Sequence, residues 1–461
     1  MKIEEIIASD RPAAQIIADL KKKTINVPAW ALLEKEYDTS KHPVMDKALY
    51  PDKLMKNGTY ERVTRYTLGW QKLAVKRMTE LLFGLPVTRV YNTHDNEDEK
   101  RVSLIMEDIF KRNRINSVNI ERGRCLYASC EVVTLWYSQE VATMYAGEQS
   151  PYKLRCKNYS PMNGDTLYPL FDEYDDMIAL SVEYSRAEGD ATVTYFDTYT
   201  ADKHIRWRTT GGASEIDIEE NIDLQKITGV YAYRPEPIWE GQSANVYEAE
   251  WTLSRNGNYI RKNARPNWVV FSDDNIGFGG EKSGSEEGRN VLQYSSNSRA
   301  EYVTWQQAID SIKFHIEEIK RNYFMELQLP DMSMDNMKAT PMSGEARKMM
   351  FIDAQMKATD ESGLWYEYFD REINVVRAFM KKMYPALATA IDELAVEVII
   401  TPYQIKDEAE KITNLTNATG GKAVMSQRTA IKYLGYADDV DTEMEQIAKE
   451  DMGDVFEQPV M

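Results

Sequence analysis

Two glycine-rich segments are the first places in the sequence where residue types and spacing could bind a phosphate group. Residues 277–280, GFGG, follow a short apolar run, as the loop of a dinucleotide-binding fold does. Polar sequence rich in glycine and serine comes next, although a helix must begin there to cradle a pyrophosphate. In residues 419–423, TGGKA, Thr416 stands where a phosphate loop has its first glycine, and Ala423 replaces the magnesium-binding hydroxyl. The sequence therefore predicts no nucleotide site at either segment, and a turn at residues 419–423.

Cysteine and histidine residues lack the spacing of a metal site. Zinc ligands come in closely spaced pairs, whereas the four histidines are scattered along the chain at His42, His94, His204 and His315. Cys125 and Cys130 are separated by four residues, and no second pair accompanies them. With Cys156 the cysteines number three, which cannot close a disulfide framework and suits a reducing compartment. The sequence predicts three buried thiols, with neither a metal nor a cofactor.

Two runs of acidic residues are the remaining candidates for chemistry. They occupy residues 95–99 and 438–441 and could in principle supply the carboxylates of a two-metal nuclease. Such a site needs carboxylates that converge in a dry cleft, whereas neighbouring acids in a run are usually solvated. The sequence predicts two solvated loops here and no catalytic residue.

Size and charge restrict the class of protein further. With 461 residues and 43% hydrophobic content, the chain can bury one large core or two to three smaller ones. The 56 basic and 74 acidic residues give a net charge of −18, which argues against a protein that grips nucleic acid over most of its surface. Residues 1–25 mix charges, and nowhere do 18 apolar residues run together. The sequence predicts a folded protein in solution, with no membrane contact.

The first half of the chain changes its hydrophobic period once. Residues 60–83 carry apolar residues at roughly helical spacing until Gly84 and Pro86, which predicts a helix-rich start. Residues 165–235 alternate with a period of two and are rich in valine, tyrosine and threonine. They predict an antiparallel sheet with one wet face.

The second half is predicted to contain long helices. A helix over residues 243–262 precedes a loop-rich segment, which contains the short strand WVVF. Apolar residues then recur at steps of three and four, which predicts a helical seam over Tyr302, Trp305, Ile309, Ile312, Ile316, Ile319 and Tyr323. A second seam, from Met349 to Met383, predicts a helix roughly 55 to 60 Å long that Pro385 ends. A buried strand AVEVIITPY, a short helix between Ser426 and Gly435, and an acidic helix complete the chain.

The order of these elements, together with several local motifs, resembles the portal proteins of tailed bacteriophages, in particular the siphophage-type portal family. LLFGLPV at residues 81–87 resembles the turn that ends an early helix of that family, and ERGRCLYASCEVV, with Gly123 before a strand, resembles the start of its wing sheet. YSPMNGDTLYPLFDEYDDMIALSVEYSR is similar to a proline-rich turn followed by paired strands. Two further segments match the start of the long helix and the C-terminal pattern of the family, through Ser343, Gly344 and Ala346, and through Ser426, Thr429, Asp439, Glu443 and Glu450.

The resemblance spans roughly residues 60 to 450, and it implies an α+β, predominantly helical portal fold that assembles into a ring of about twelve subunits. The helix from Ser243 departs from the family because it lacks the usual asparagine-rich entry, which leaves its register open. The implied regions are a wing (1–240), a first stem helix (241–262), a clip (263–298), a second stem helix (299–324), a tunnel loop (325–342), the long helix with its return to the wing (343–403) and a crown (404–461).

The same resemblance implies a structural subunit, not an enzyme, at the portal vertex of the virion capsid, assembled in the host cytoplasm. Double-stranded DNA passes through its channel, and its implied protein partners are the terminase large subunit, the head-tail adaptor, the major capsid protein and the scaffolding protein. A net acidic channel suits this role because it repels the phosphate backbone and lets DNA slide. The expected clip contacts are Trp268, Phe271, Asp273, Asp274 and Phe278.

Two sets of residues keep more than one interpretation. Lys313, Lys320, Arg321, Lys338 and Met337 are candidates for weak contacts with moving DNA, or are ordinary solvated and locally packed residues. The seam residues Trp305, Ile309, Ile312, Ile316 and Ile319 are candidates for contacts between subunits, or pack within one subunit. Two other classes of protein also stay open: a metal-dependent nuclease or other packaging enzyme, and a virion structural protein without a channel.

Overall fold

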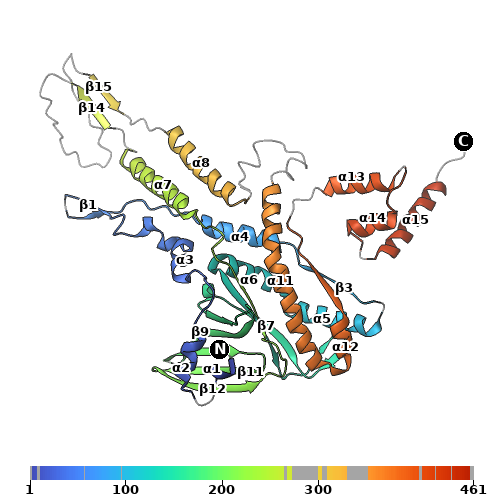
Figure 1. Ribbon diagram of the computed structural model, residues 1–461. Helices are drawn as coiled ribbons and strands as arrows, with labels where there is room; N and C mark the ends of the chain where they lie inside the picture. Colours follow the sequence, from blue (N-terminus) through green and yellow to red (C-terminus); the bar gives the residue numbers. More distant parts are fainter. Residues whose placement is uncertain are drawn as a thin grey trace, which may run out of the picture.

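The computed structural model of the protein describes residues 3–7, 11–56, 58–94, 96–189, 191–263, 267–271, 299–303, 309–329, 351–403, 408–420, 422–437 and 439–456. Figure 1 shows a body of sheets and helices, an arm of two helices that projects from it, and a small group of helices near the C-terminus. Helix α11 (Ile352–Met383) runs down through the body. Helices and antiparallel sheets share the described chain, as expected for an α+β protein.

The largest core lies where helices pack around α11. These helices are α3 (Trp30–Tyr37), α4 (Trp70–Phe83), α5 (Glu97–Arg112), α6 (Ile115–Ser129) and α12 (Ala388–Glu393). Helices α4 and α6 approach closely at Gly123, where a Cβ atom would lie 2.9 Å from Phe83 Cε2 and 3.2 Å from Thr79 Cγ2. Only glycine fits this crossing without displacing its neighbours.

A buried ion pair fixes α6 to α11 inside this core. Arg122 donates from Nη1 to Glu372 Oε1 at 2.7 Å and from Nη2 to Glu372 Oε2 at 3.1 Å. Trp136 Nε1 donates to the same carboxylate at 3.2 Å. The two charged side chains are at most 1% exposed, so each neutralises a charge that water cannot reach.

Two antiparallel sheets form the rest of the body. The larger has the order β12-β11-β10-β9-β8, with strands β8 (Thr166–Phe171), β9 (Met177–Glu188), β10 (Ala191–Tyr199), β11 (Lys203–Thr210) and β12 (Ala213–Asn221). The smaller has the order β13-β4-β7, with strands β13 (Gly229–Tyr233), β4 (Glu131–Gln139) and β7 (Lys153–Tyr159). The antiparallel pairing predicted for residues 165–235 is confirmed, but β13 belongs to the smaller sheet. The prediction of one wet face is wrong, because buried clusters lie on both faces of the larger sheet.

Both faces of the larger sheet are partly covered. Leu180 and Val182 share a buried cluster with Tyr231 of the smaller sheet. On the other face, α1 (Ile3–Ile6) and α2 (Ala13–Leu20) pack over Phe196 and Trp207. The remaining strands form two-stranded ribbons: β1 (Lys53–Leu54) with β2 (Tyr60–Glu61), β3 (Thr88–Asn92) with β16 (Ala395–Ile399), β5 (Thr143–Tyr145) with β6 (Glu148–Ser150), and β14 (Asn267–Phe271) with β15 (Arg299–Val303).

Two helices begin later than the sequence predicted. Residues 60–61 form strand β2, residues 62–68 are extended, and α4 begins only at Trp70. The helix predicted from residue 299 begins at Ile309, because residues 299–303 pair with β14 and Tyr302 lies opposite Trp268. In both places apolar spacing fits a helix, but hydrogen bonds to another segment satisfy the extended backbone instead.

The long helix also departs from its predicted seam. The second half of the seam is buried, from Phe369 to Met383, but Ile352 and Met356 are 48% and 64% exposed. A strict seam of three and four drifts by about 20° per heptad around a straight helix, so it leaves the core after a few turns. Ala354, Ala358 and Trp365 supply the buried face in the first half. Pro385 follows the helix end as predicted, in a 3-10 turn.

Three other local predictions have definite outcomes. Strand β16 is buried on one face only: Val398 packs into the main core, whereas Ala395, Glu397 and Ile399 are exposed, so the prediction of a buried strand holds for one face. Glu97, Asp98 and Glu99 of the acidic run form the first turn of α5, where negative charge is favourable at the helix N-terminus, instead of a solvated loop. Helix α14 (Gln427–Leu434) is confirmed, because Ser426 caps it through Thr429 N–H and Gly435 ends it at a φ of 77°. Helices α13 (Glu408–Thr419) and α15 (Val440–Phe456) flank it, and the chain turns after Thr419 as predicted.

Candidate functional site: the two-helix arm and its strap

The projecting arm consists of two antiparallel helices, α7 (Ser243–Asn263) and α8 (Ile309–Glu326). Contacts join them along their lengths: Gln242 Nε2 hydrogen-bonds Glu326 Oε2 at the body end, and His315 Nε2 lies 3.6 Å from Glu248 Oε1 further out. Both helices were expected as stem helices, and α7 matches the predicted residues 243–262 within one residue. The arm is the feature that stands out most from the body in Figure 1.

A third layer of the arm is an extended segment, residues 62–68, which we call the strap. Its backbone N–H groups donate to side chains on one face of α7. The bonds run from Leu68 N to Glu250 Oε1 at 2.6 Å, from Tyr66 N to Ser254 Oγ at 2.9 Å, and from Thr64 N to Asn258 Oδ1 at 2.7 Å. Two residues of extended chain span about 6.6 Å and four residues of helix span about 6 Å, so the two repeats stay in register. The side chains of α7 therefore take the place of the neighbouring strand that the strap's backbone lacks.

Close packing and a buried pair complete the joint between strap and α7. A Cβ atom on Gly257 would lie 2.8 Å from Thr64 Cγ2 and 3.0 Å from Tyr66 Cε2, so only glycine allows the strap this near. At the body end, His42 Nδ1 lies 2.7 Å from Glu250 Oε1, and both side chains are fully buried. The strap and α7 are thus held as one unit at several levels of the arm.

The predicted seam of α8 lies mostly against the inside of the chain. Ile319 is 9% exposed and Tyr323 is fully buried, while Ile312 and Ile316 are half-buried. Ile309 is the first residue of α8, and Trp305 lies outside the described residues. Three of the five predicted oligomer contacts, Ile312, Ile316 and Ile319, therefore pack within the single chain. Contact of these residues with a neighbouring subunit stays a prediction.

The basic residues proposed for DNA contact divide between two sides of α8. Lys313 and Lys320 are seven residues apart and share a side, and Lys313 Nζ lies 3.7 Å from Glu317 Oε1. Arg321 is 70% exposed and pairs with Glu318 at 3.2 Å. Lys338 and Met337 lie outside the described residues. Among the described residues of α8, these basic side chains form no cluster. Lys313 and Arg321 each lie beside a glutamate.

Of the expected clip residues, Trp268 and Phe271 belong to strand β14, at the end of the arm far from the body (Figure 1). Asp273, Asp274 and Phe278 lie outside the described residues, as do the glycines of residues 277–280. The ribbon of β14 and β15 places two of the predicted contacts beyond α7 and α8. Their role stays a prediction.

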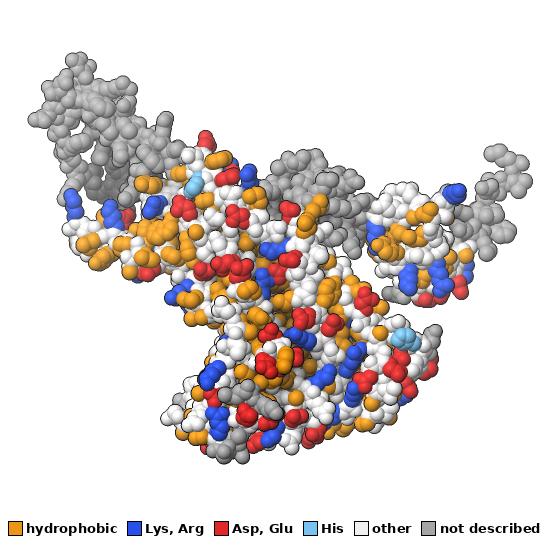
Figure 2. Space-filling model, viewed as in Figure 1, with side chains coloured by type: hydrophobic (Ala, Val, Ile, Leu, Met, Phe, Trp, Pro, Cys, Tyr) orange, Lys and Arg blue, Asp and Glu red, His pale blue; other side chains and the backbone are white. Residues whose placement is uncertain are grey.

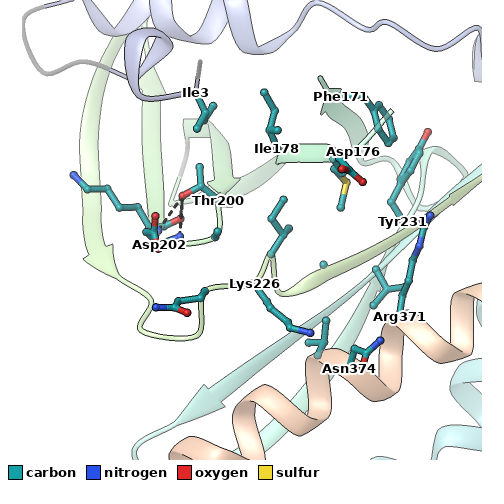
Figure 3. Close-up of a pocket in the computed structure, with 18 of the residues that line it drawn as sticks. Ile3, Phe171, Asp176, Ile178, Thr200, Asp202, Lys226, Tyr231, Arg371 and Asn374 are labelled. Carbon is teal, nitrogen blue, oxygen red and sulfur yellow. Dashed lines mark hydrogen bonds between the residues drawn. The ribbon is translucent and has the colours of Figure 1, made fainter. Parts of the chain in front are cut away.

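A cavity of about 650 Å³ lies within the body, between the larger sheet, the segment before β13 and α11. Figure 3 shows Ile178 and Phe171 on its sheet side and Arg371 and Asn374 on α11, with Lys226 between. Thr200 Oγ1 accepts the N–H of Lys203 within its own turn, so this hydroxyl is occupied. The arrangement mixes apolar and charged groups but aims no base at a nucleophile.

The cysteines do not form a reactive site either. Cys125 and Cys130 are buried and Cys156 is half-buried, and all three are free thiols. Burial raises the pKa of Cys125 to about 11 and the pKa of Cys130 and Cys156 to about 12. A thiol with such a pKa is a poor nucleophile at neutral pH. Within the described chain, no group of three or more histidine, cysteine or acidic residues could hold a metal ion.

The family to which the chain belongs follows from a comparison with known protein families. A family model described as phage portal protein, SPP1 Gp6-like, matches residues 21–455. The chain belongs to this family of phage portal proteins, which are structural components of the virion and connect head to tail. The resemblance noted in the sequence is confirmed.

A solved structure described as the neck of an empty GTA particle, computed with C6 symmetry, is 12% identical to this chain, covers 92% of it and 98% of its own chain, and has a TM-score of 0.37. No curated protein matches the sequence. Across the described residues, no helix is long and apolar enough to cross a bilayer.

The strap is a structural element that sequence reasoning missed. Its residues were assigned to a helix, and their partners on α7 were not singled out. A signal was present, because Glu250, Ser254 and Asn258 recur every four residues on one face of a predicted helix. Polar residues at that spacing indicate a face that satisfies something polar, but the sequence does not say which segment.

Proposed function

We propose that this protein is one subunit of a ring of about twelve copies at a capsid vertex, through which double-stranded DNA is packaged and ejected. Membership of the portal family supports the structural role. The observation that carries the channel is the arm: two antiparallel helices of 21 and 18 residues, stiffened by the strap, that project from a packed body. Arms of this kind, arranged side by side around an axis, would line a tube.

Regions of the subunit are assigned accordingly. Residues 1–240 are the wing, 241–262 and 299–324 the stem, 263–298 the clip, 325–342 the tunnel loop, 343–403 the long helix with its return, and 404–461 the crown. The clip would meet the terminase large subunit during packaging and the head-tail adaptor afterwards. The wing would meet the major capsid and scaffolding proteins, and assembly would take place in the host cytoplasm.

Lys313 and Lys320 would make weak contacts with passing DNA. A small number of basic side chains in contact with DNA suits a conduit, because each phosphate neutralised by a lysine or arginine strengthens binding and slows movement. The chain carries a net charge of −18, so retention of duplex DNA by the whole ring is unfavourable.

Electron microscopy of the purified full chain tests the proposal. We expect annular particles with a projecting stem and a central hole wide enough for duplex DNA, and native mass spectrometry should count about twelve subunits. Monomers or filaments under all assembly conditions would reject the proposal. Hydrolysis of ATP or DNA by the pure protein, abolished by substitution of a carboxylate cluster, would favour a packaging enzyme instead.

A further inference from the structure

The arm has two exposed apolar faces on opposite sides, and neither is covered within the described chain. At about 100° per residue, Glu248, which faces α8, points about 200° away from Glu250, which faces the strap. The strap and α8 therefore lie on opposite sides of α7, as Figure 1 also shows. On one side of α7 lies the strap, which Tyr50 and Asp52 flank through hydrogen bonds to Val63 and Arg65, and on the other side lies α8.

The outer face of α8 carries two large apolar side chains and acidic residues. Phe314 is 67% exposed and Met325 is 60% exposed. Asp310, Phe314, Glu317, Arg321 and Met325 follow one another at steps of four, three, four and four, so they share a face opposite the seam of Ile316 and Ile319. Asp310 and Glu317 are exposed, and Arg321 is already paired with Glu318. We call this surface the helix face.

The surface on the strap side carries exposed aromatic and basic side chains, which complement the apolar and acidic side chains of the helix face. Tyr60 is 70% exposed, Tyr66 is 51% exposed, and Leu54, opposite Tyr60 in the β1–β2 ribbon, is 61% exposed. Arg62 is exposed between the tyrosines, and Arg261 of α7 donates to its carbonyl oxygen at 2.8 Å. Figure 2 shows hydrophobic side chains gathered on this part of the arm with basic side chains among them. We call Leu54, Tyr60, Arg62 and Tyr66 the strap face.

We propose that the strap face of one subunit binds the helix face of the next copy of this chain, and that this contact sets the arms side by side. The inference rests on the proposed ring. Exposed aromatic and basic groups on the strap face suit the aromatic, methionine and acidic groups of the helix face. A ring needs a heterologous contact between two different surfaces on opposite sides of the subunit, and these two faces meet that requirement.

This assignment differs from a contact through the α8 seam. Ile316 and Ile319 face inward, whereas Phe314 and Met325 point away from the core. Gly257 and the three α7 side chains hold the strap against the helix, and hydrogen bonds from Val63 and Arg65 to Asp52 hold it further.

The proposal is tested with two variants, each of which carries substitutions in only one of the two faces. The strap variant is Tyr60→Asp with Arg62→Glu, and the helix variant is Phe314→Asp. All three positions are exposed, so circular dichroism and the unfolding midpoint should match wild type. Each variant alone should fail to form rings at protein concentrations where wild type does, with subunit affinity at least about tenfold weaker. Tyr174→Asp, a 78% exposed tyrosine on the β8–β9 turn, is the control and should form normal rings.

Mixing the two variants distinguishes this contact from any other. The strap variant keeps an intact helix face and the helix variant keeps an intact strap face, so one good contact can form between them and no second one. The mixture should give one-to-one dimers and no rings, as measured by native mass spectrometry. Rings from either variant alone, full rings from the mixture, or a mixture of monomers would each overturn the proposed contact. Absence of rings in wild type would instead reject the proposed function.

Discussion

At the scale of single residues, the ion pair between Arg122 and Glu372 ties the long helix to the body. Replacing Glu372 by Gln leaves the Arg122 guanidinium buried with no counter-charge, which typically costs about 3 to 5 kcal/mol. We expect a large fall in the unfolding midpoint of E372Q, measured by calorimetry. The matched control is Glu367→Gln on the same helix, whose partner Arg371 is 55% exposed, and it should change stability by no more than about 0.5 kcal/mol. Equal effects from both would contradict this account.

His204 gives the sheet a stability that depends on pH. Burial lowers the pKa of this imidazole, but the carboxylates of Asp197 and Glu220 outweigh burial and raise the pKa above its ordinary 6.5. Nδ1 lies 2.7 Å from Glu220 Oε1, and Nε2 lies 3.7 Å from Asp197 Oδ1. Because the folded pKa is the higher one, this contribution is complete below pH 6.5 and is lost as the pH rises through the folded pKa.

The corresponding measurement is the free energy of unfolding between about pH 6 and 9, across the range where histidine titrates. Wild type should lose stability over that interval relative to His204→Gln, whose side chain cannot titrate. Parallel pH profiles for the two proteins would show that the two carboxylates do not hold a proton on His204.

At the scale of elements, two helical glycines should respond to alanine with opposite signs. Alanine is favoured over glycine in a helix by about 1 kcal/mol. At Gly363 of α11 a Cβ atom meets nothing within 4 Å, so Gly363→Ala should raise stability by up to that amount. At Gly257 the new Cβ would lie 2.8 Å from Thr64 Cγ2, so Gly257→Ala should push the strap off α7.

Hydrogen exchange provides the readout for Gly257→Ala. The amides of Thr64, Tyr66 and Leu68 donate to α7 and should be protected in wild type, then exchange faster in the variant. Exchange elsewhere in the body should stay as in wild type. Unchanged protection of these three amides would mean that α7 does not hold the strap.

At the scale of the whole molecule, the net charge bears on the proposed passage of DNA. A subunit with a net charge of −18 repels the phosphate backbone except near a few lysines. We expect the assembled protein to retain no duplex DNA at physiological salt in a mobility-shift or anisotropy measurement. Lys313→Gln with Lys320→Gln should leave ring formation intact, since these residues lie on a different side of α8 from Phe314. Tight, salt-resistant binding by wild type would contradict a conduit.

The sequence by itself determined the features that depend on local periodicity and on single residues. The antiparallel sheet of residues 165–235 follows from a period of two, and the end of α11 from Pro385. Helix α14 follows from its cap Ser426 and its terminal Gly435. Collinear short motifs sufficed to indicate the portal family, which the family model confirms.

Only the tertiary structure decided which segments lie beside one another. The strap has the apolar spacing of a helix, yet a distant helix accepts its backbone hydrogen bonds, and nothing within residues 62–68 encodes that partner. Tyr302 likewise continues a helical seam but pairs with Trp268 across a ribbon. Packing also decides which side chains of the arm are exposed. Phe314 and Ile316 are both apolar, but Phe314 is exposed and Ile316 is half-buried. A short window of sequence fixes what a segment can form, and long-range hydrogen bonds and packing decide what it does form.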